Sequence, residues 1–129
     1  ARSDGFDFLG YRFEGGRRRP RRKSLMKLKD TIRAKTGRTA GHSLSVIIAD
    51  INRTLRGWFE YFKHSHRATF PPLDGWIRRR LRNILRKRHG RKGIASGLDN
   101  LRWPNAYFAK QGLFSLREAH AQARQSCAR

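Results

Sequence analysis

Residues 41–62 of the chain read GHSLSVIIADINRTLRGWFEYF, and residues 71–88 read PPLDGWIRRRLRNILRKR. In the first segment, apolar residues recur at the spacing of one helix face, within an arc about 120° wide. They are Leu44, Ile47, Ile48, Ile51, Leu55, Trp58, Phe59 and Phe62. Ser43 is a residue type that commonly caps a helix N-terminus. We therefore predict a long amphipathic helix over residues 43–64.

The second segment predicts another amphipathic helix, over residues 71–88, because proline is tolerated in a first helical turn. Its apolar positions are Leu73, Trp76, Ile77, Leu81, Ile84 and Leu85. Four arginines fall on the far side within about 100° at helical spacing, and they are Arg78, Arg79, Arg82 and Arg86. Arg80 falls on the apolar side. A half-buried arginine needs a partner, and we expect Asp50, Glu60 or a helix C-terminus.

Shorter helices are predicted on both sides of this pair. Residues 24–36 have an apolar stripe, with Ser24 as the predicted N-cap. Pro104 suits the first turn of a helix that ends before Gly112, and residues 115–118 form a capping box for a last helix. Residues 89–97 are rich in glycine and in basic residues, which is typical of a loop.

The N-terminal region predicts β-structure. The aromatic run FDFLGYRF at residues 6–13 ends at Gly15 and Gly16, which favours a short strand before a turn. Residues 17–23 are either the second arm of a hairpin or a basic loop. The predicted fold is therefore mainly α: a three-helix bundle (24–36, 43–64 and 71–88), two short C-terminal helices, and a short N-terminal strand or hairpin.

Composition favours a polyanionic partner. The 129 residues include 31 Lys and Arg against 9 Asp and Glu, a formal charge of +22. Such a balance indicates nucleic acid first and an anionic membrane surface second. No apolar run approaches the ~20 residues of a membrane span. A single cysteine, Cys127, provides no disulfide framework, which is compatible with a reducing compartment.

The expected RNA contacts are cations that fork onto phosphate oxygens. The first group is Arg78, Arg79, Arg82 and Arg86. The second group is Arg53, Arg56, Arg17, Arg18, Arg19, Arg21, Arg22 and Lys23. Tyr61 lies off the apolar arc and is a candidate for base stacking. Neutralising about six to eight phosphates predicts a slope of log K against log salt of about −4 to −7.

Catalysis is not predicted for this chain. The nine acidic residues are dispersed, whereas two-metal chemistry needs clustered carboxylates. His64 and His66 lack a cysteine pair or a carboxylate at ligand spacing, so we expect no metal and no cofactor. His64 and Arg67 with the later Tyr107 faintly echo the tyrosine recombinases, which leaves a fragment of a DNA enzyme as a remote alternative.

Four stretches together resemble the maturase-specific region (domain X, or thumb) of group II intron-encoded reverse transcriptases. FLGYRF at 8–13 is similar to the block that ends the polymerase palm. Asn52 with LRGWFEYF at 55–62, and LDGWIRRRLR at 73–82, are similar to two helices of that region. GLFSL at 112–116 is similar to a segment near the end of many such proteins.

This resemblance implies an end of the palm over residues 1–23 and a helical thumb over residues 24–129. It also implies a role: to grip intron RNA during splicing and to hold the template–primer during reverse transcription. The implied partners are intron RNA, the template–primer, and the fingers and palm of a parent polymerase in a bacterial cytoplasm or an organelle. The alternative from composition alone is a basic structural module that binds RNA or DNA without specificity.

Overall fold

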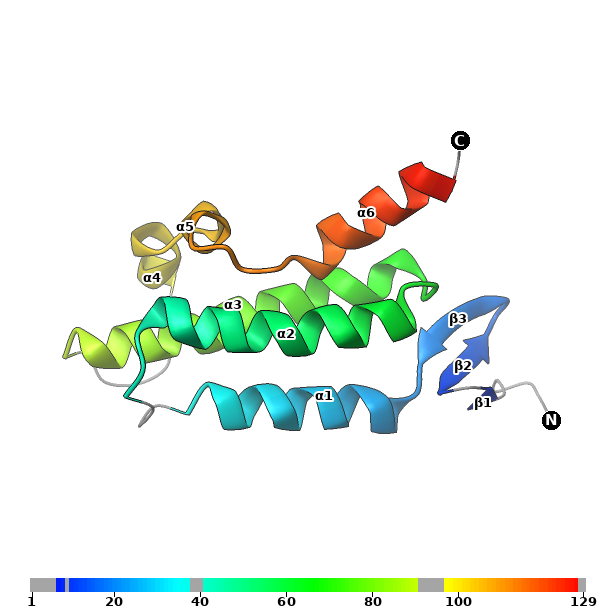
Figure 1. Cartoon of the computed structure of the whole chain (residues 1–129), viewed down its shortest axis with the longest axis horizontal. Helices are drawn as coiled ribbons and strands as arrows, with labels where there is room; N and C mark the ends of the chain where they lie inside the picture. The colour runs from blue at the N-terminus through cyan, green and yellow to red at the C-terminus, as the bar shows by residue number, and fades with distance from the viewer. Residues whose placement is uncertain (1–6, 9, 38–40, 91–96, 128–129) are drawn as a thin grey trace.

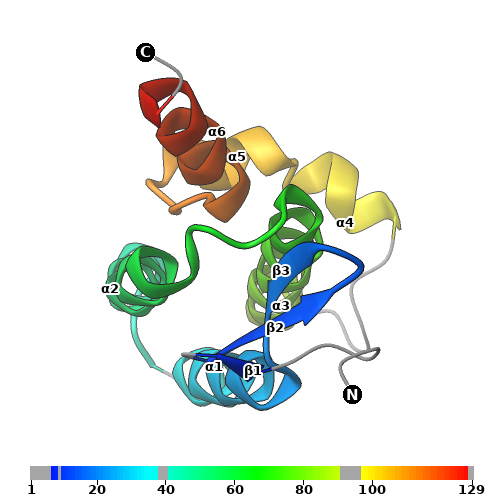
Figure 2. The ribbon, with the colours of Figure 1, turned by 90° about the vertical axis from the view of Figure 1, so that its right-hand side faces the viewer.

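The computed structural model describes residues 7–8, 10–37, 41–90 and 97–127. Three long helices form the body of the molecule: α1 (Arg22–Lys35), α2 (Leu44–Phe62) and α3 (Phe70–Arg88). Three shorter helices, α4 (Gly97–Arg102), α5 (Asn105–Lys110) and α6 (Leu116–Cys127), cover the side of α2 and α3 that faces away from α1. Figures 1 and 2 show the resulting three layers, with a small sheet at one end.

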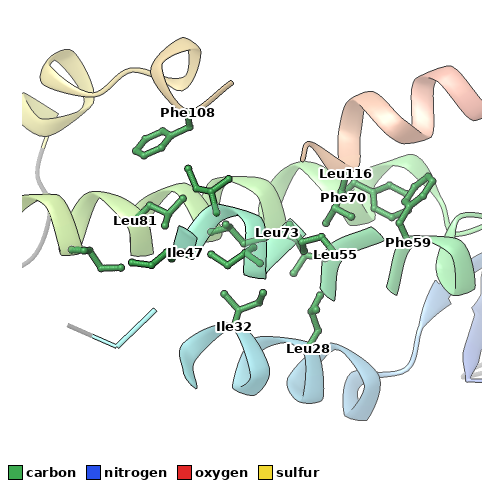
Figure 3. Close-up of a cluster of buried hydrophobic side chains, with 14 of the residues drawn as sticks. Leu28, Ile32, Ile47, Leu55, Phe59, Phe70, Leu73, Leu81, Phe108 and Leu116 are labelled. Carbon is green, nitrogen blue, oxygen red and sulfur yellow. The ribbon is translucent and has the colours of Figure 1, made fainter. Parts of the chain in front are cut away.

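The core lies between these layers, and it confirms the predicted helix faces (Figure 3). The buried residues of α2 and α3 belong to the two predicted apolar arcs, apart from Phe70 at the start of α3 and a few polar ones. Fully buried members from the three long helices include Ile32, Ile51, Leu55 and Leu81. Ser43 caps α2 as predicted, since its Oγ accepts a hydrogen bond from the Val46 N–H at 3.4 Å. Burial of these side chains is the main stabilising contribution to the bundle.

Two polar side chains of the bundle hold the segment that connects α5 to α6. Asn52 on α2 donates from Nδ2 to the Gly112 carbonyl at 2.7 Å and accepts from the Phe114 N–H at 2.8 Å. Asp74 on α3 accepts from the backbone N–H groups of Leu116 and Arg117, both at 3.0 Å. The Asp74 carboxylate therefore satisfies two of the N–H groups that the first turn of α6 leaves without helical partners.

Arg80 has one of the partners expected for it, a helix C-terminus. Its Nε donates to Thr36 Oγ1 at 2.9 Å, and Nη2 reaches the carbonyls of Arg33 and Thr36 at 3.5 and 3.4 Å. These carbonyls end α1, where a cation complements the negative end of the helix dipole. The contact joins α3 to α1 at the edge of the core.

We expect Thr36→Val to lower the free energy of unfolding by about 1–2 kcal/mol, because Thr36 is buried and its hydroxyl bonds both Arg80 and the Ile32 carbonyl. Thr31→Val is the matched control, since the Thr31 hydroxyl bonds only the Lys27 carbonyl at an exposed position. Urea unfolding of the two variants provides the measurement. Equal losses would show that the link between α1 and α3 contributes nothing.

The N-terminal segment forms a three-stranded antiparallel sheet of β1 (Asp7–Phe8), β2 (Tyr11–Glu14) and β3 (Arg17–Pro20), in that order. Gly15 and Gly16 have φ of +57° and +77°, the left-handed pair that a two-residue hairpin turn needs. The predicted hairpin is thus confirmed over the alternative of a basic loop.

Two local predictions need correction, and a third lies largely outside the described residues. Helix α1 begins at Arg22, and its N-cap Arg21 has no side-chain capping bond, so Ser24 lies inside the helix and does not cap it. The helix starts directly where β3 ends, because the backbone at Arg21 is still extended. Helix α4 was not predicted. Of the basic segment predicted as a loop over residues 89–97, residues 91–96 lie outside the described part of the chain.

Candidate nucleic-acid interface

The arginines of α3 do not form one exposed face, contrary to expectation. Arg82 is buried, with 7% of its surface exposed. Its Nε donates to the Trp103 carbonyl at 2.8 Å and its Nη2 to Asn105 Oδ1 at 2.9 Å. Burial lowers the pKa of Arg82, and the charge of Arg78 lowers it further. Arg82 therefore holds the segment between α4 and α5 against α3.

Arg86 has a similar structural role. Its Nη1 lies 2.7 Å from Oδ2 of Asp99, which is buried on α4. The prediction that the four arginines form one basic face did not take α4 and α5 into account, and these helices cover this side of α3. Asp99 and Trp103 follow Arg86 by 13 and 17 residues, so helical periodicity within α3 gave no sign of them.

Arg78 and Arg79 are the two members of the predicted face that keep solvent access. Arg79 is exposed, and Arg78 is half-buried beside a hollow of about 310 Å³ between α3 and the α5–α6 region. The Arg78 Nε atom is buried and has no hydrogen-bond partner among the described residues. Only Arg79 is fully accessible to a large anion at this face.

The predicted contacts on α2 are accessible. Arg53 and Arg56 are exposed; Arg53 lies 3.6 Å from Asp50, and the Arg56 guanidinium lies over the Phe114 ring at 5.6 Å. A hydrogen bond from Lys35 lowers the pKa of Asp50. Tyr61 is 55% exposed, which leaves much of its side chain open to solvent, as base stacking requires.

The basic residues of the hairpin are held on a fixed frame. The Tyr11 hydroxyl donates to the Tyr61 carbonyl at 2.8 Å, and the His66 N–H donates to the Arg18 carbonyl at 2.7 Å. Because an isolated hairpin is marginally stable in water, these two bonds and the packing of the Tyr11 ring against Phe62 tie it to the end of α2 and to the connection that follows. Arg17, Arg18, Arg22 and Lys23 are exposed, while Arg19 and Arg21 are half-buried.

A hollow of about 380 Å³ lies between the hairpin, α1 and the start of α3. We call it the α1 hollow. Its basic lining residues are Arg12, Arg19, Arg22 and Lys29. None of the described residues that line it is acidic.

A second hollow, which we call the His66 hollow, surrounds the connection between α2 and α3. One part of about 790 Å³ lies between that connection and α6, and an adjoining part of about 440 Å³ lies against the hairpin. Figure 2 shows the connection crossing between α6 and the sheet. The charged and imidazole side chains that line the two parts are Arg17, Arg18, Lys63, His64, His66, Arg67, His120 and Arg124.

Sequence reasoning placed only Arg17 and Arg18 of this set among the RNA contacts. The sequence offered one indication of the other residues: the pair His66-Arg67 lies in a loop between two helices with clear apolar periodicity. Arg124 belongs to α6 and reaches the hollow only because Asp74 and Asn52 fix the preceding segment. Its position could not be predicted from the spacing of residues in the sequence.

The two histidines of the hollow lie in a positive field. Burial lowers the pKa of His66, and the guanidiniums of Arg17, Arg19, Arg67 and Arg124 lower it further. Burial also lowers the pKa of His120, as do Arg124 and His66, whereas a backbone hydrogen bond with Ser65 opposes the change. Both imidazoles are therefore held toward their neutral forms.

Metal centres and membrane spans are both absent from the described part of the chain. No group of three or more His, Cys, Asp or Glu side chains there could hold a metal ion. No helix there is both long enough and apolar enough to cross a membrane.

A comparison with protein-family models places the chain in a family. The family described as "Group II intron, maturase-specific domain" matches residues 25–103, more than half of the chain. This range runs from α1 to the end of α4 and contains the whole of α2 and α3. No curated protein matches the chain.

Proposed function

Because this chain belongs to the family of group II intron maturase-specific domains, we propose that it grips intron RNA to promote splicing. We further propose that it holds the template–primer during reverse transcription by a parent polymerase. The matched domain is a non-catalytic thumb region of intron-encoded proteins, so the polymerase chemistry belongs to other parts of such a parent. Its fingers and palm are the proposed protein partners.

One observation carries the proposal: the cations of the hairpin and of α1 surround the α1 hollow without an acidic residue among its described lining. Arg22 lines it and is exposed, and its neighbour in the chain, Lys23, is exposed as well. Arginine and lysine placed in this way bind phosphate oxygens through charge-assisted hydrogen bonds. The proposed contact set is therefore led by Arg22 and Lys23, and it extends to Arg17, Arg18, Arg19, Arg21, Arg53, Arg56, Tyr61 and Arg79.

We expect the chain to prefer a structured group II intron RNA over a duplex DNA of equal length and over an unrelated folded RNA. Fluorescence anisotropy at several salt concentrations measures this, and the slope of log K against log salt should be about −4 to −7. Equal affinity for all three competitors, lost together as salt rises, would favour the alternative of a non-specific basic module. In that case sequence and shape recognition would reside elsewhere in the parent protein.

The variant Arg22→Gln/Lys23→Gln tests the carrying observation. We expect it to weaken RNA binding roughly tenfold and to make the salt slope shallower by about 1 to 2. Lys87→Gln/Lys110→Gln removes two exposed charges elsewhere on the molecule and serves as the matched control. If the two variants bind RNA alike, the α1 hollow is not part of the interface.

A further inference from the structure

The His66 hollow differs from the other basic surface regions in the balance of its charges. Among the described residues that line it, none is acidic. Lys63, which also lines it, is paired with Glu60 at 3.3 Å. By contrast, Arg86 is neutralised by Asp99, and Arg53 and Lys35 share Asp50. Repulsion between its guanidiniums is therefore left uncompensated within the described part of the chain.

The arginines of the hollow come from three separate elements. Arg17 and Arg18 extend from β3, Arg67 belongs to the 3₁₀ turn Arg67–Thr69, and Arg124 lies on α6. Arg67 and Arg124 are exposed, and neither pairs with a carboxylate within the described residues. Since the tertiary fold gathers like charges here at an energetic cost, an anion is the ligand that relieves the repulsion.

His66 contributes a hydrogen-bond donor of defined tautomer. Its Nδ1 accepts from the Ala68 N–H at 3.2 Å, so the proton of the neutral imidazole is on Nε2. The backbone N–H of His66 is bound to the Arg18 carbonyl, which fixes the residue between the hairpin and the 3₁₀ turn. A neutral imidazole can donate one bond to a phosphate oxygen, and the guanidiniums around it supply the charge.

We propose that the His66 hollow binds a backbone phosphate of RNA, with His66 and the guanidiniums of Arg67 and Arg124 as its principal donors. The proposal rests on the RNA binding proposed above and adds a second contact, on the far side of the 3₁₀ turn from the α1 hollow. Phosphate chemistry is shared by free inorganic phosphate and by an RNA strand, so both are used as probes.

The first test follows the imidazole signals of His66 by NMR as a function of pH. An anion in the hollow counteracts Arg17, Arg19, Arg67 and Arg124, so the pKa of His66 should rise when inorganic phosphate or single-stranded oligouridylate is added. By linkage, both ligands should then bind more tightly as the pH falls through the titration of His66. His64 and His120 also line the hollow. The signals of His89, exposed beside Trp103 at the other end of α3, should not respond.

The second test compares two charge-matched variants. We expect Arg67→Ala/Arg124→Ala to weaken oligouridylate binding roughly tenfold and to flatten the salt slope by about 0.7, the value for one phosphate of a single strand. Lys87→Ala/Lys110→Ala should change affinity less than about threefold and leave the slope unchanged. Both variants remove exposed side chains, so the fold should be retained, and circular dichroism verifies this.

The outcomes separate the two proposals. If neither probe moves the His66 signals, or if the two variants bind RNA alike, the hollow is not a phosphate site. If inorganic phosphate moves them and oligouridylate does not, the hollow holds free anions and the assignment to RNA is wrong. If the chain binds no RNA at all, the proposed function is wrong. If in that case the His66 signals still respond to inorganic phosphate, the assignment of the hollow to RNA is wrong too.

Discussion

Replacing Asp74 with alanine should lower the free energy of unfolding by about 3 kcal/mol, a large part of the stability of a domain of this size. Asp74 is 5% exposed, and its two oxygens accept three hydrogen bonds from the start of α6. One donor, the Leu116 N–H, belongs to a residue with no exposed surface. Without the carboxylate, buried N–H groups lose their partners, and the favourable negative charge at the N-terminus of α6 is removed.

Asp30→Ala is the matched control, because Asp30 is 70% exposed and pairs only with Arg33 on the surface of α1. Removing it should change stability by no more than about 0.5 kcal/mol. Urea unfolding measures both variants, and hydrogen exchange shows whether α6 detaches before the rest unfolds. Equal stability of the two variants would mean that α6 is held by its apolar face alone. The loss of net negative charge is the same in both, so general repulsion cannot explain a difference.

The second large effect is expected at Arg82. Arg82→Ala should destabilise the protein by about 2–4 kcal/mol, because it leaves the Trp103 carbonyl and the Asn105 side chain without their buried donor. The guanidinium also lies over the Phe108 ring at 5.3 Å. Arg82→Lys should recover only part of the loss, since an ammonium cannot reach both acceptors with the fork of a guanidinium.

Arg79→Ala separates this structural role from RNA binding. Arg79 lies on the same helix and carries the same charge, but it is exposed. We expect the Arg79 variant to be as stable as the unsubstituted chain and to bind RNA several-fold more weakly. The Arg82 variant should show its main effect in urea unfolding. If Arg82→Ala were as stable as Arg79→Ala, the contacts of Arg82 with the α4–α5 region would contribute nothing to folding.

Several features of the protein were determined by the sequence alone. The apolar positions of α2 and α3 recur every three or four residues, so each helix and its buried face follow from local spacing. Ser43, the Gly15-Gly16 turn and the Ser115 capping position act within a few residues of their own location. The net charge of +22 likewise required no structure. Each of these signals is carried by neighbours along the chain, which is why it could be read there.

Tertiary structure decided which charges are available to a ligand. Periodicity assigns α3 one apolar face and one basic face, but it does not show that α4 and α5 cover part of the basic face. Arg82 and Arg86 therefore became structural residues, while Arg67 and Arg124, 57 residues apart in the chain, came to line one hollow. The physical reason is that the accessibility of a guanidinium depends on the acceptors nearest to it. For Arg82 and Arg86, those acceptors belong to other elements of the fold. The packing of α6 against the end of the bundle, with Asn52 and Asp74 holding the segment before it, places Arg124 in the same hollow as Arg67.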